Sequence, residues 1–414
     1  MAKSVRCVNI DWLEVYCKES NDLFPCDAQF FRDRHYTVRE REYGTRQYRE
    51  MFVILDKDNE PFIEVRRNPV SSSVSSAQFG IYDPLSCHIR LSNRYCYADN
   101  AVDLLAEFLQ QYDYTVQRLY RLDLCLDFEK FDRGDDPQKI VTRYMDGTYT
   151  KINQGNIAAH GADRWEARTW SSLSWGAPKS MVSTKLYNKT KELSEAKDKP
   201  YIRYAWWRAG LIDDFRDLTK MGSDGQPYKP TIWRVEFSIR SEARGWYVYE
   251  DCSGQKTKTL KREHTLTTYA AKSDQLKAFA FLAHHYFHFK KYEAGKRKDL
   301  CEDKVLFDFG FHEVYSLDRL LTSTPKDRTL DALKKRLRLF KMQHPDRQVS
   351  EACTSLLSFI DSLSVRQSIP YGTNNEAKLL QLLIERRMTV GKEEDMTQSI
   401  AQVQALLTLG DVLF

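Results

Sequence analysis

The chain has 414 residues, enough for two domains of ordinary size, and a formal net charge of +5. A hydrophobic fraction of 42%, a charged fraction of 29% and a mean hydropathy of −0.59 exclude a disordered or membrane-embedded protein. No apolar run approaches the roughly 20 residues of a spanning helix, and the N-terminus lacks the apolar stretch of a secretory signal. Nine cysteines without CxxC pairs argue against a disulfide framework, so we expect a cytoplasmic protein without a membrane partner.

The first half of the chain is predicted to consist mostly of strands. Short β-rich runs bounded by turn residues predict strands around Phe52–Leu55, Phe62–Arg66 and His88–Leu91. One helix interrupts them, capped by Asp99 or Asn100. Its apolar stripe follows helical spacing and consists of Val102, Leu105, Phe108 and Leu109.

The segment Arg121–Glu129 carries the clearest local pattern. Side chains alternate across a strand, so one face is apolar, with Leu122, Leu124, Leu126 and Phe128. The other face carries Arg121, Asp123, Asp127 and Glu129. Three carboxylates on one face repel one another unless a divalent metal, a basic side chain or solvent relieves them, and hard oxygen ligands suit Mg²⁺ or Mn²⁺. In a regular strand Asp123 and Asp127 lie roughly 13 Å apart, so a shared ion would need a ligand from another strand.

Two later segments show the same alternation. In Ser183–Lys189 one face carries Lys185, Tyr187 and Lys189. In Ile232–Arg240 the polar face carries Arg234, Glu236, Ser238 and Arg240, opposite Trp233, Val235, Phe237 and Ile239. Side by side in one sheet, the three strands would gather the parts that phosphoryl transfer needs: metal ligands, cations and a hydroxyl nucleophile. Each strand taken singly is also explained by an exposed sheet face with cross-strand ion pairs, and Tyr187 is one of 23 tyrosines.

Beyond Ser253 the pattern becomes helical. Thr329 can cap a helix whose apolar face is Leu330, Leu333, Leu337 and Phe340. Similar patterns follow at Val349–Leu363 and Asn375–Met388, and a last helix runs from near Met396 to Gly410. We therefore expect a boundary near residues 245–265, with an α+β domain before it and a helical domain after it.

Positive charge is concentrated between Gly254 and Leu300. This segment holds eleven lysines and arginines against four acidic residues, interleaved with aromatic residues that include Tyr269, Tyr286, Phe287 and Tyr292. Cations mixed with aromatic rings suit a polyanion with bases that can stack. A solvated helix face explains the same composition equally well.

The three strand segments, in this order, resemble the replication-initiation-factor family. This family comprises the trans-acting Rep proteins of rolling-circle plasmids and related relaxases of integrative conjugative elements. Its first motif, Arg-hydrophobic-Asp-hydrophobic-x-hydrophobic-Asp, matches Arg121–Asp127. An aromatic-Gly segment, a serine and a strand ending in Tyr-Asn-Lys match Trp175-Gly176, Ser180 and Tyr187-Asn188-Lys189. Trp-Arg-hydrophobic-Glu matches Trp233–Glu236, and Asn9–Leu13 is similar to the family's first strand. The resemblance covers about residues 8–250.

The resemblance implies an α+β fold, an antiparallel sheet like that of HUH endonucleases, in residues 1–250. The helical pattern beyond it predicts a helical, partly basic domain in residues 260–414. In this family carboxylates replace the usual metal-binding histidines, and this chain has no His-hydrophobe-His triplet among its nine histidines. Tyr187 would attack a DNA phosphate, keep the 5′-phosphate and release a 3′-OH. Mg²⁺ or Mn²⁺ would be held by Asp123, Asp127 and Glu236.

Further candidate site residues follow from the same resemblance and from the basic segment. Lys185, Lys189 and Arg234 would position phosphate oxygens or lower the pKa of the phenol. The expected DNA contacts are Arg121, Lys290, Lys291, Lys296, Arg297 and Lys298. Candidate partners besides DNA that is single-stranded at the nick are a second copy of the chain and a host helicase.

Two features differ from the plasmid initiators: a longer stretch between Tyr187 and Trp233, and a larger C-terminal helical region. Conjugative relaxases share the chemistry, and a DNA-binding protein without catalysis is the alternative of a different class. His284 and His288 have a spacing that can bind zinc, although no third ligand suggests itself. His344–Arg347 followed by Tyr371 formally fits a tyrosine recombinase, but Pro345 would disturb a helix there. Cys125 has no neighbouring histidine and is interpreted as structural.

Overall fold

The computed structural model describes residues 5–20, 25–70, 84–152, 157–164, 167–177, 180–196, 198–252, 255–297, 300–310, 315–318, 328–343 and 347–362. Two compact units divide the chain, Met1–Asp318 and Arg319–Phe414. Among the described residues, no helix is both long and apolar enough to cross a membrane.

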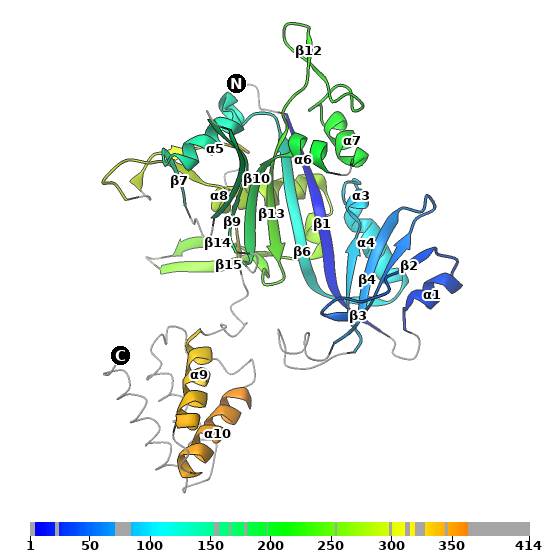
Figure 1. Cartoon of the computed structure of the whole chain (residues 1–414), viewed down its shortest axis with the longest axis vertical. Helices are drawn as coiled ribbons and strands as arrows, with labels where there is room; N and C mark the ends of the chain where they lie inside the picture. Colours follow the sequence, from blue (N-terminus) through cyan, green and yellow to red (C-terminus); the bar gives the residue numbers. More distant parts are fainter. Residues whose placement is uncertain are drawn as a thin grey trace. The chain divides into compact units, whose positions relative to one another are not determined.

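A large antiparallel sheet organises the first unit (Figure 1). Its ten strands lie in the order β2-β3-β4-β5-β1-β6-β13-β10-β9-β8. Their bounds in chain order are β1 Arg6–Glu19, β2 Val38–Glu40, β3 Tyr48–Leu55, β4 Pro61–Pro69, β5 Ser86–Leu91, β6 Tyr114–Phe128, β8 Ile157–Arg164, β9 Ala167–Trp175, β10 Val182–Asn188 and β13 Trp233–Arg240. The three strands expected around residues 52–55, 62–66 and 88–91 are confirmed as parts of β3, β4 and β5.

Helices and shorter strands surround this sheet. The helices of the first unit are α1 Ala28–Asp33, α3 Asn93–Cys96, α4 Ala101–Gln111, α5 Pro137–Met145, α6 Lys189–Glu195, α7 Pro200–Arg208 and α8 Lys272–Tyr286. The shorter strands are β7 Tyr149–Lys151, β11 Lys220–Met221, β12 Pro227–Tyr228, β14 Gly245–Cys252, β15 Gln255–Glu263, β16 Phe289–Lys291, β17 Asp303–Lys304 and β18 Ser316–Asp318. Helix α4 confirms the expected helix, and its four predicted apolar residues are all buried.

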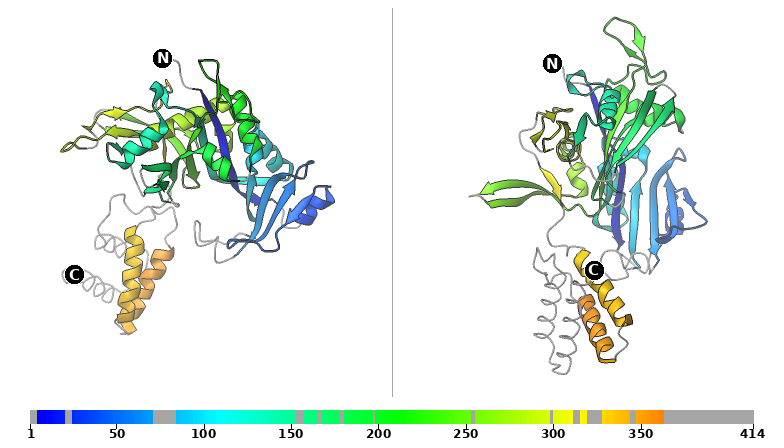
Figure 2. Two further views of the ribbon diagram at one scale, coloured as in Figure 1. Left: turned by 45° about the horizontal axis from the view of Figure 1, so that its top comes forward. Right: turned by 60° about the vertical axis from the view of Figure 1, so that its left-hand side comes forward.

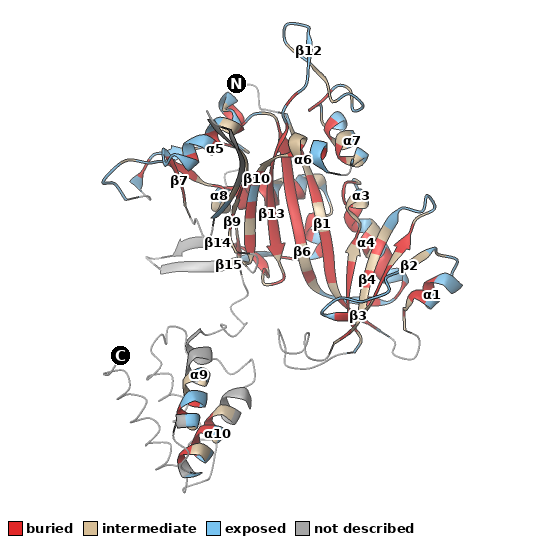
Figure 3. Ribbon diagram, in the orientation of Figure 1, coloured by how far each residue is buried: buried red, intermediate tan, exposed pale blue. Residues whose placement is uncertain are grey.

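The core of the sheet follows from the alternation of side chains on its central strands. Leu122, Leu124 and Leu126 on β6 are fully buried, as are Val235 and Phe237 on β13. Helix α8 covers this apolar face, because Phe279 packs on Phe237 with ring centroids 5.0 Å apart. Each fully buried side chain of this size stabilises the fold by roughly 1.5–3 kcal/mol. Figure 3 shows β1, β6 and β13 buried along most of their length.

The region after residue 245 differs from the helical pattern expected there. Hairpin β14–β15 projects away from the large sheet (Figure 2), and β18 pairs with β14. Alternation of threonine with lysine in β15, as in Lys256-Thr257-Lys258-Thr259, has the period of a strand. The first unit therefore extends to Asp318, well beyond the boundary expected near residues 245–265.

Two helices are described in the second unit, α9 Arg328–Gln343 and α10 Arg347–Ser362. They match the helices expected after Thr329 and at 349–363. Leu337 and Phe340 of α9 are buried, as are Ala352 and Leu356 of α10. The helices expected at 375–388 and 396–410 lie outside the described residues, as does the loop at 71–76.

Candidate functional site

Strands β6, β13 and β10 are neighbours in the sheet, as the three segments of alternating polarity suggest. Directly opposed residues of an antiparallel pair share a face, so the register sorts the polar residues into rows. The rows, read from β6 through β13 to β10, are Asp127–Arg234–Tyr187, Cys125–Glu236–Lys185 and Asp123–Ser238–Ser183. Residues from segments more than 100 positions apart thus meet on one polar face.

Tyr187 lies at the end of β10, where strand turns into helix. Asn188 caps α6, and its side-chain oxygen accepts a hydrogen bond from the backbone N–H of Lys191 at 2.9 Å. Lys189 begins the helix and its Nζ lies 5.3 Å from the centroid of the Tyr187 ring. The three residues of the Tyr-Asn-Lys motif therefore have separate physical roles: a hydroxyl, a cap and a buried cation.

The Tyr187 hydroxyl is paired with a carboxylate. It donates to Oε2 of Glu236 at 2.9 Å, and the Nζ of Lys185 lies 3.4 Å from Oε1 of the same side chain. Glu236 is buried, Tyr187 is partly buried and Lys185 is about half exposed. A hydroxyl, a base within hydrogen-bond reach and an exposed ammonium group form the arrangement expected of an activated nucleophile.

The protonation of this pair follows from its surroundings. Burial raises the pKa of Glu236, and the negative charges of Asp123 and Asp11 raise it further. Burial also raises the pKa of Tyr187 well above its usual value, as does the charge of Glu236, while Arg234 opposes the shift. The phenol is therefore protonated near neutral pH, and Glu236 is the carboxylate placed to accept its proton.

Arg234 lies at the centre of a buried network, away from solvent. Its Nε and one terminal nitrogen donate to the two carboxylate oxygens of Asp127 at 2.6 and 2.7 Å, and its other nitrogen donates to Asp11 at 3.0 Å. Tyr97 accepts a further bond from this guanidinium at 2.7 Å, and the indole of Trp206 donates to Asp127 at 2.7 Å. With all of these donors engaged and no exposed side-chain surface, Arg234 fixes the sheet face beside Tyr187.

Asp11 is the second carboxylate held by this arginine. Burial opposes its ionisation, but the charges of Arg234 and Lys189 outweigh burial and lower the pKa of Asp11 to about 2. Lys189 is itself buried, pairs with Glu192, and has a pKa lowered by burial and by Arg234. Lys189 and Arg234 therefore act on Tyr187 through the charge and packing around it, whereas Lys185 is open to solvent.

The three carboxylates expected to hold a metal are engaged by protein groups. Asp127 is bound by Arg234 and Trp206, Asp123 pairs with Arg121, and Glu236 accepts from Tyr187. Among the residues that the structure describes, no group of three or more His, Cys, Asp or Glu side chains is arranged to hold a metal ion. The donor set of Asp123, Asp127 and Glu236 thus does not fit a metal centre as arranged.

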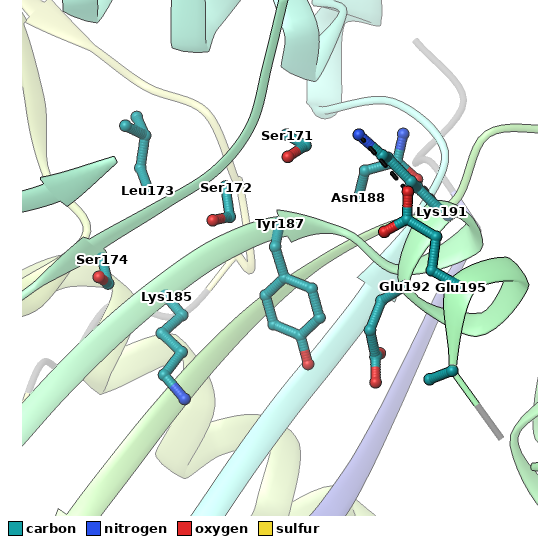
Figure 4. Close-up of a pocket in the computed structure, with 11 residues that line it drawn as sticks. Ser171, Ser172, Leu173, Ser174, Lys185, Tyr187, Asn188, Lys191, Glu192 and Glu195 are labelled. Atoms are coloured by element: carbon teal, nitrogen blue, oxygen red, sulfur yellow. Dashed lines mark hydrogen bonds and ion pairs between the residues drawn. The ribbon is translucent and has the colours of Figure 1, made fainter. Parts of the chain in front are cut away.

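A polar cavity of about 560 Å³ opens beside the tyrosine. Lys185 and Tyr187 of β10 form one wall, and serines of β9 form another, Ser171, Ser172 and Ser174. Ser172 and Ser174 lie directly opposite Tyr187 and Lys185 in the register of the two strands. Figure 4 shows Lys185 and Tyr187 projecting to the same side of the strand, with α6 and its Glu192 across from them. Hydroxyl and ammonium groups at these positions can bind a phosphate.

The residues expected to contact DNA occupy different environments. Arg121 is bound to Asp123 and its guanidinium lies 4.2 Å from the centroid of the Trp12 ring. Lys290 is buried and pairs with Asp303 at 3.0 Å, which is a structural position.

The rest of this group lies further along the chain. Lys291, Lys296 and Arg297 are exposed, on or just after β16, and Lys296 pairs with Glu293. Lys298 lies outside the described residues.

The two histidines with zinc spacing are in contact with each other. Their rings lie 5.9 Å apart, and Nε2 of His288 lies 2.8 Å from Asp303. Helix α8 ends at Tyr286, so His288 lies beyond the helix and the pair is not a helical one-turn pair.

Three residues of the site were not predicted from the sequence: Asp11, Tyr97 and Trp206. Asp11 lies in the segment that resembles the family's first strand, which was the available signal. Tyr97 and Trp206 come from helical and loop regions. Their polar contacts are made with distant segments, so the local alternation of polar and apolar residues does not reveal them. Cys125 is fully buried in the row of Glu236, in agreement with a structural role.

Comparison with known proteins gives a distant likeness. No protein family and no curated protein matches the chain. Among solved structures, the chain is similar to the rolling circle replication initiator protein from Geobacillus stearothermophilus, with a TM-score of 0.40 and 13% sequence identity. The likeness covers 73% of this chain and 93% of that one. At this score and identity, the likeness by itself decides neither the fold nor the function.

Proposed function

We propose that the protein nicks one strand of DNA by attack of Tyr187 on a backbone phosphate. The observation that carries the proposal is the hydrogen bond of the Tyr187 hydroxyl to the buried carboxylate of Glu236, at 2.9 Å, on the wall of a polar cavity. The tyrosine lies at the position that the resemblance to replication initiation factors assigns to the nucleophile. A nucleophile, its base and a cavity lined by hydroxyl and ammonium groups occur together there.

The proposed step balances as follows. Glu236 accepts the phenolic proton while Oη of Tyr187 forms a bond to phosphorus. The bond from phosphorus to the 3′ oxygen breaks, and that oxygen leaves with the electron pair and takes a proton from solvent. The products are a 5′-phosphotyrosyl link and a free 3′-OH, and the reverse step joins the same ends.

The cations around the tyrosine divide into two groups under this proposal. Lys185 is about half exposed and lines the cavity with Lys191, so both are placed to contact phosphate oxygens and offset charge in the transition state. Arg234 and Lys189 are buried and act as positioning residues. A requirement for Mg²⁺ or Mn²⁺ stays a prediction from the resemblance.

The biological role that we propose is initiation of rolling-circle replication of a plasmid or other mobile element. A relaxase of a conjugative or mobilisable element would use the same chemistry on a transfer origin. A DNA-binding protein without catalysis is the alternative of another class, and the Tyr187–Glu236 contact favours catalysis over it. A second copy of the chain and a host helicase remain candidate partners.

The test is incubation of the full chain with supercoiled DNA from the replicon that encodes it, with Mg²⁺ or Mn²⁺. We expect nicked circles with protein bound covalently to the 5′ end. Tyr187→Phe should abolish both products while retaining DNA binding, because it removes the nucleophilic oxygen alone. A variant of another exposed tyrosine, Tyr43→Phe, serves as the matched control and should nick like the wild type.

Two outcomes would contradict the proposal. An adduct formed by Tyr187→Phe would assign the nucleophile to another residue. A wild-type protein that binds the DNA but never nicks it, with either metal, would establish the non-catalytic alternative.

A further inference from the structure

Helix α7 has one buried face and one exposed face. The buried face makes hydrogen bonds and packing contacts with residues of the candidate site. Trp206 donates to Asp127, the partner of Arg234, and the carbonyl of Ala205 accepts from Cys7 of β1 at 3.5 Å. Tyr201 packs against Tyr97, with ring centroids 5.1 Å apart. These contacts fix α7 over the end of the polar sheet face that carries Tyr187.

The opposite face of α7 displays aromatic rings to solvent. Tyr204 and Trp207, three positions apart on the helix, are 50% and 43% exposed, and Phe215 in the following loop is 38% exposed. The ring centroids of Tyr204 and Trp207 lie 5.6 Å apart, and those of Trp207 and Phe215 lie 6.1 Å apart. These three residues form a continuous surface, called the aromatic patch below. Large adjoining rings in water mark a binding surface more often than a folding requirement.

Arginines border the aromatic patch. Arg208 is half exposed, pairs with the exposed Asp99 at 2.8 Å and follows Trp207 directly. Arg203 precedes Tyr204, and the guanidinium of Arg216 lies 6.0 Å from the centroid of the Phe215 ring. Exposed ion pairs of this kind are weak, so a phosphate can replace the carboxylate partner at little cost. Arg203 pairs with Asp198, and Asp214 and Asp217 lie next to Arg216 in the loop. The surface therefore offers stacking rings together with cations whose exposed carboxylate neighbours a phosphate backbone would have to displace.

We propose that unpaired bases of the DNA strand stack on the aromatic patch beside the nicking site. Rings flanked by arginines bind single strands, because each base has a π-face and each nucleotide a phosphate. Bases in a duplex are stacked on each other and cannot reach the rings. Trp, Tyr and Arg also suit a protein interface, so binding of a protein is an outcome of the test. The three arginines spaced along the rings can each meet a phosphate of one extended strand, which favours single-stranded DNA. The inference rests on the proposed function for its choice of DNA as substrate.

The test is a binding measurement that is independent of nicking. Trp207→Ala is made in the Tyr187→Phe background, and its affinity for a fluorescent 20-nucleotide oligothymidine is compared with that for an abasic strand of the same length. Loss of one stacking ring should weaken oligothymidine binding by about fivefold to 150-fold. Affinity for the abasic strand should change by less than about twofold, because its phosphates remain.

Three controls distinguish stacking from other effects. Trp207→Tyr keeps a ring and should restore most of the affinity, whereas Tyr43→Ala removes an exposed ring elsewhere and should leave it unchanged. Unchanged thermal unfolding of Trp207→Ala would show that the fold is intact.

Two results would overturn the inference: unchanged oligothymidine affinity in Trp207→Ala, or an equal loss on both strands. A change in sedimentation without a change in affinity would assign the aromatic patch to a second copy of the chain instead. The two proposals fail separately. Nicking by wild type with unchanged affinity in Trp207→Ala removes this inference alone, and ring-dependent binding without any nicking removes the proposed chemistry alone.

Discussion

Glu236→Gln is the substitution that tests the site most directly. Glutamine has nearly the same size, and its amide oxygen can still accept a hydrogen bond from the Tyr187 hydroxyl, but it does not take up the proton. In the wild type the carboxylate lies 2.9 Å from the hydroxyl, so the proton moves directly and without a bridging water. The variant should therefore bind DNA normally and attack the phosphate slowly.

The size of the loss follows from the protonation of the phenol. A tyrosine with the ordinary pKa near 10 is ionised in only about one molecule in 300 at pH 7.5. Burial and the charge of Glu236 raise the pKa of Tyr187 further in the wild type, so most molecules need a base. General-base catalysis contributes roughly 10²–10⁴-fold. We expect the nicking rate of Glu236→Gln to fall by about 300-fold to 10⁴-fold, equivalent to about 3.4–5.5 kcal/mol.

The assay is single-turnover nicking of a labelled single-stranded oligonucleotide, followed as covalent adduct on a denaturing gel across a range of pH. Wild-type activity requires ionised Glu236, so it falls as the pH drops through the pKa of this residue. That loss should occur at higher pH than for an ordinary glutamate near 4.5, because burial and Asp123 raise the pKa. Glu236→Gln should not show this loss of activity at low pH. Its nicking rate should instead rise with pH, as the concentration of hydroxide increases.

Asp123→Asn tests the pKa argument, because Asp123 pairs with Arg121 rather than with the tyrosine but its charge raises the pKa of Glu236. This variant should keep nicking, and its loss of activity at low pH should shift to lower pH. A Glu236→Gln rate within threefold of wild type, with the same pH profile, would refute the role of Glu236 as base. Recovery of Glu236→Gln by raised Mg²⁺ or Mn²⁺ would identify the residue as a metal ligand, as the family resemblance implies.

Four further outcomes are expected. Asp127→Ala leaves the buried guanidinium of Arg234 without its bidentate partner, so urea denaturation should show a loss of about 3–5 kcal/mol; a loss below 1 kcal/mol would contradict the network. Lys185→Ala removes a half-exposed cation, so stability should change by less than about 1 kcal/mol while nicking falls roughly 10²-fold; equal nicking would exclude its phosphate role. Lys291→Ala with Arg297→Ala should lower the slope of log affinity against log salt by about one per lost phosphate contact, and an unchanged slope would remove these residues from the DNA surface. The family resemblance implies a divalent metal, whereas the arrangement of Asp123, Asp127 and Glu236 does not form a metal site; if the resemblance holds, EDTA would abolish nicking and Mg²⁺ or Mn²⁺ restore it, and full activity in EDTA would disprove the metal requirement.

The alternation of polar and apolar residues along the sequence was sufficient to predict the strands of the site and which of their side chains share a face. Alternation in Arg121–Glu129 and Ile232–Arg240 identified which side chains share a face, and the register of β6, β13 and β10 agrees with that assignment. The apolar stripe of α4 was equally visible, because helical spacing repeats over three turns. Periodicity is a short-range property, and these elements depend on it.

Contacts between segments that are far apart in the chain could not be predicted from the sequence. The pairing of Asp127 with Arg234 converts an expected metal ligand and an expected phosphate contact into one buried ion pair. Trp206 completes that pair from a helix that no strand motif includes. The first unit extends beyond the expected boundary because hairpin β14–β15 occupies a lysine-rich stretch whose composition also suits a solvated helix. Such outcomes depend on which segments pack together.

The order of strands in the sheet has a consequence for how the protein is made. Strand β13 lies between β6 and β10, although it follows both in the chain. During synthesis, β10 emerges with its tyrosine before the strand that supplies Glu236, and pairing across such sequence separations is slow. A nascent chain that ends before Trp233 has its nucleophile but not its base. Under the proposed chemistry, the protein would therefore become able to cut DNA only after the ribosome has passed β13.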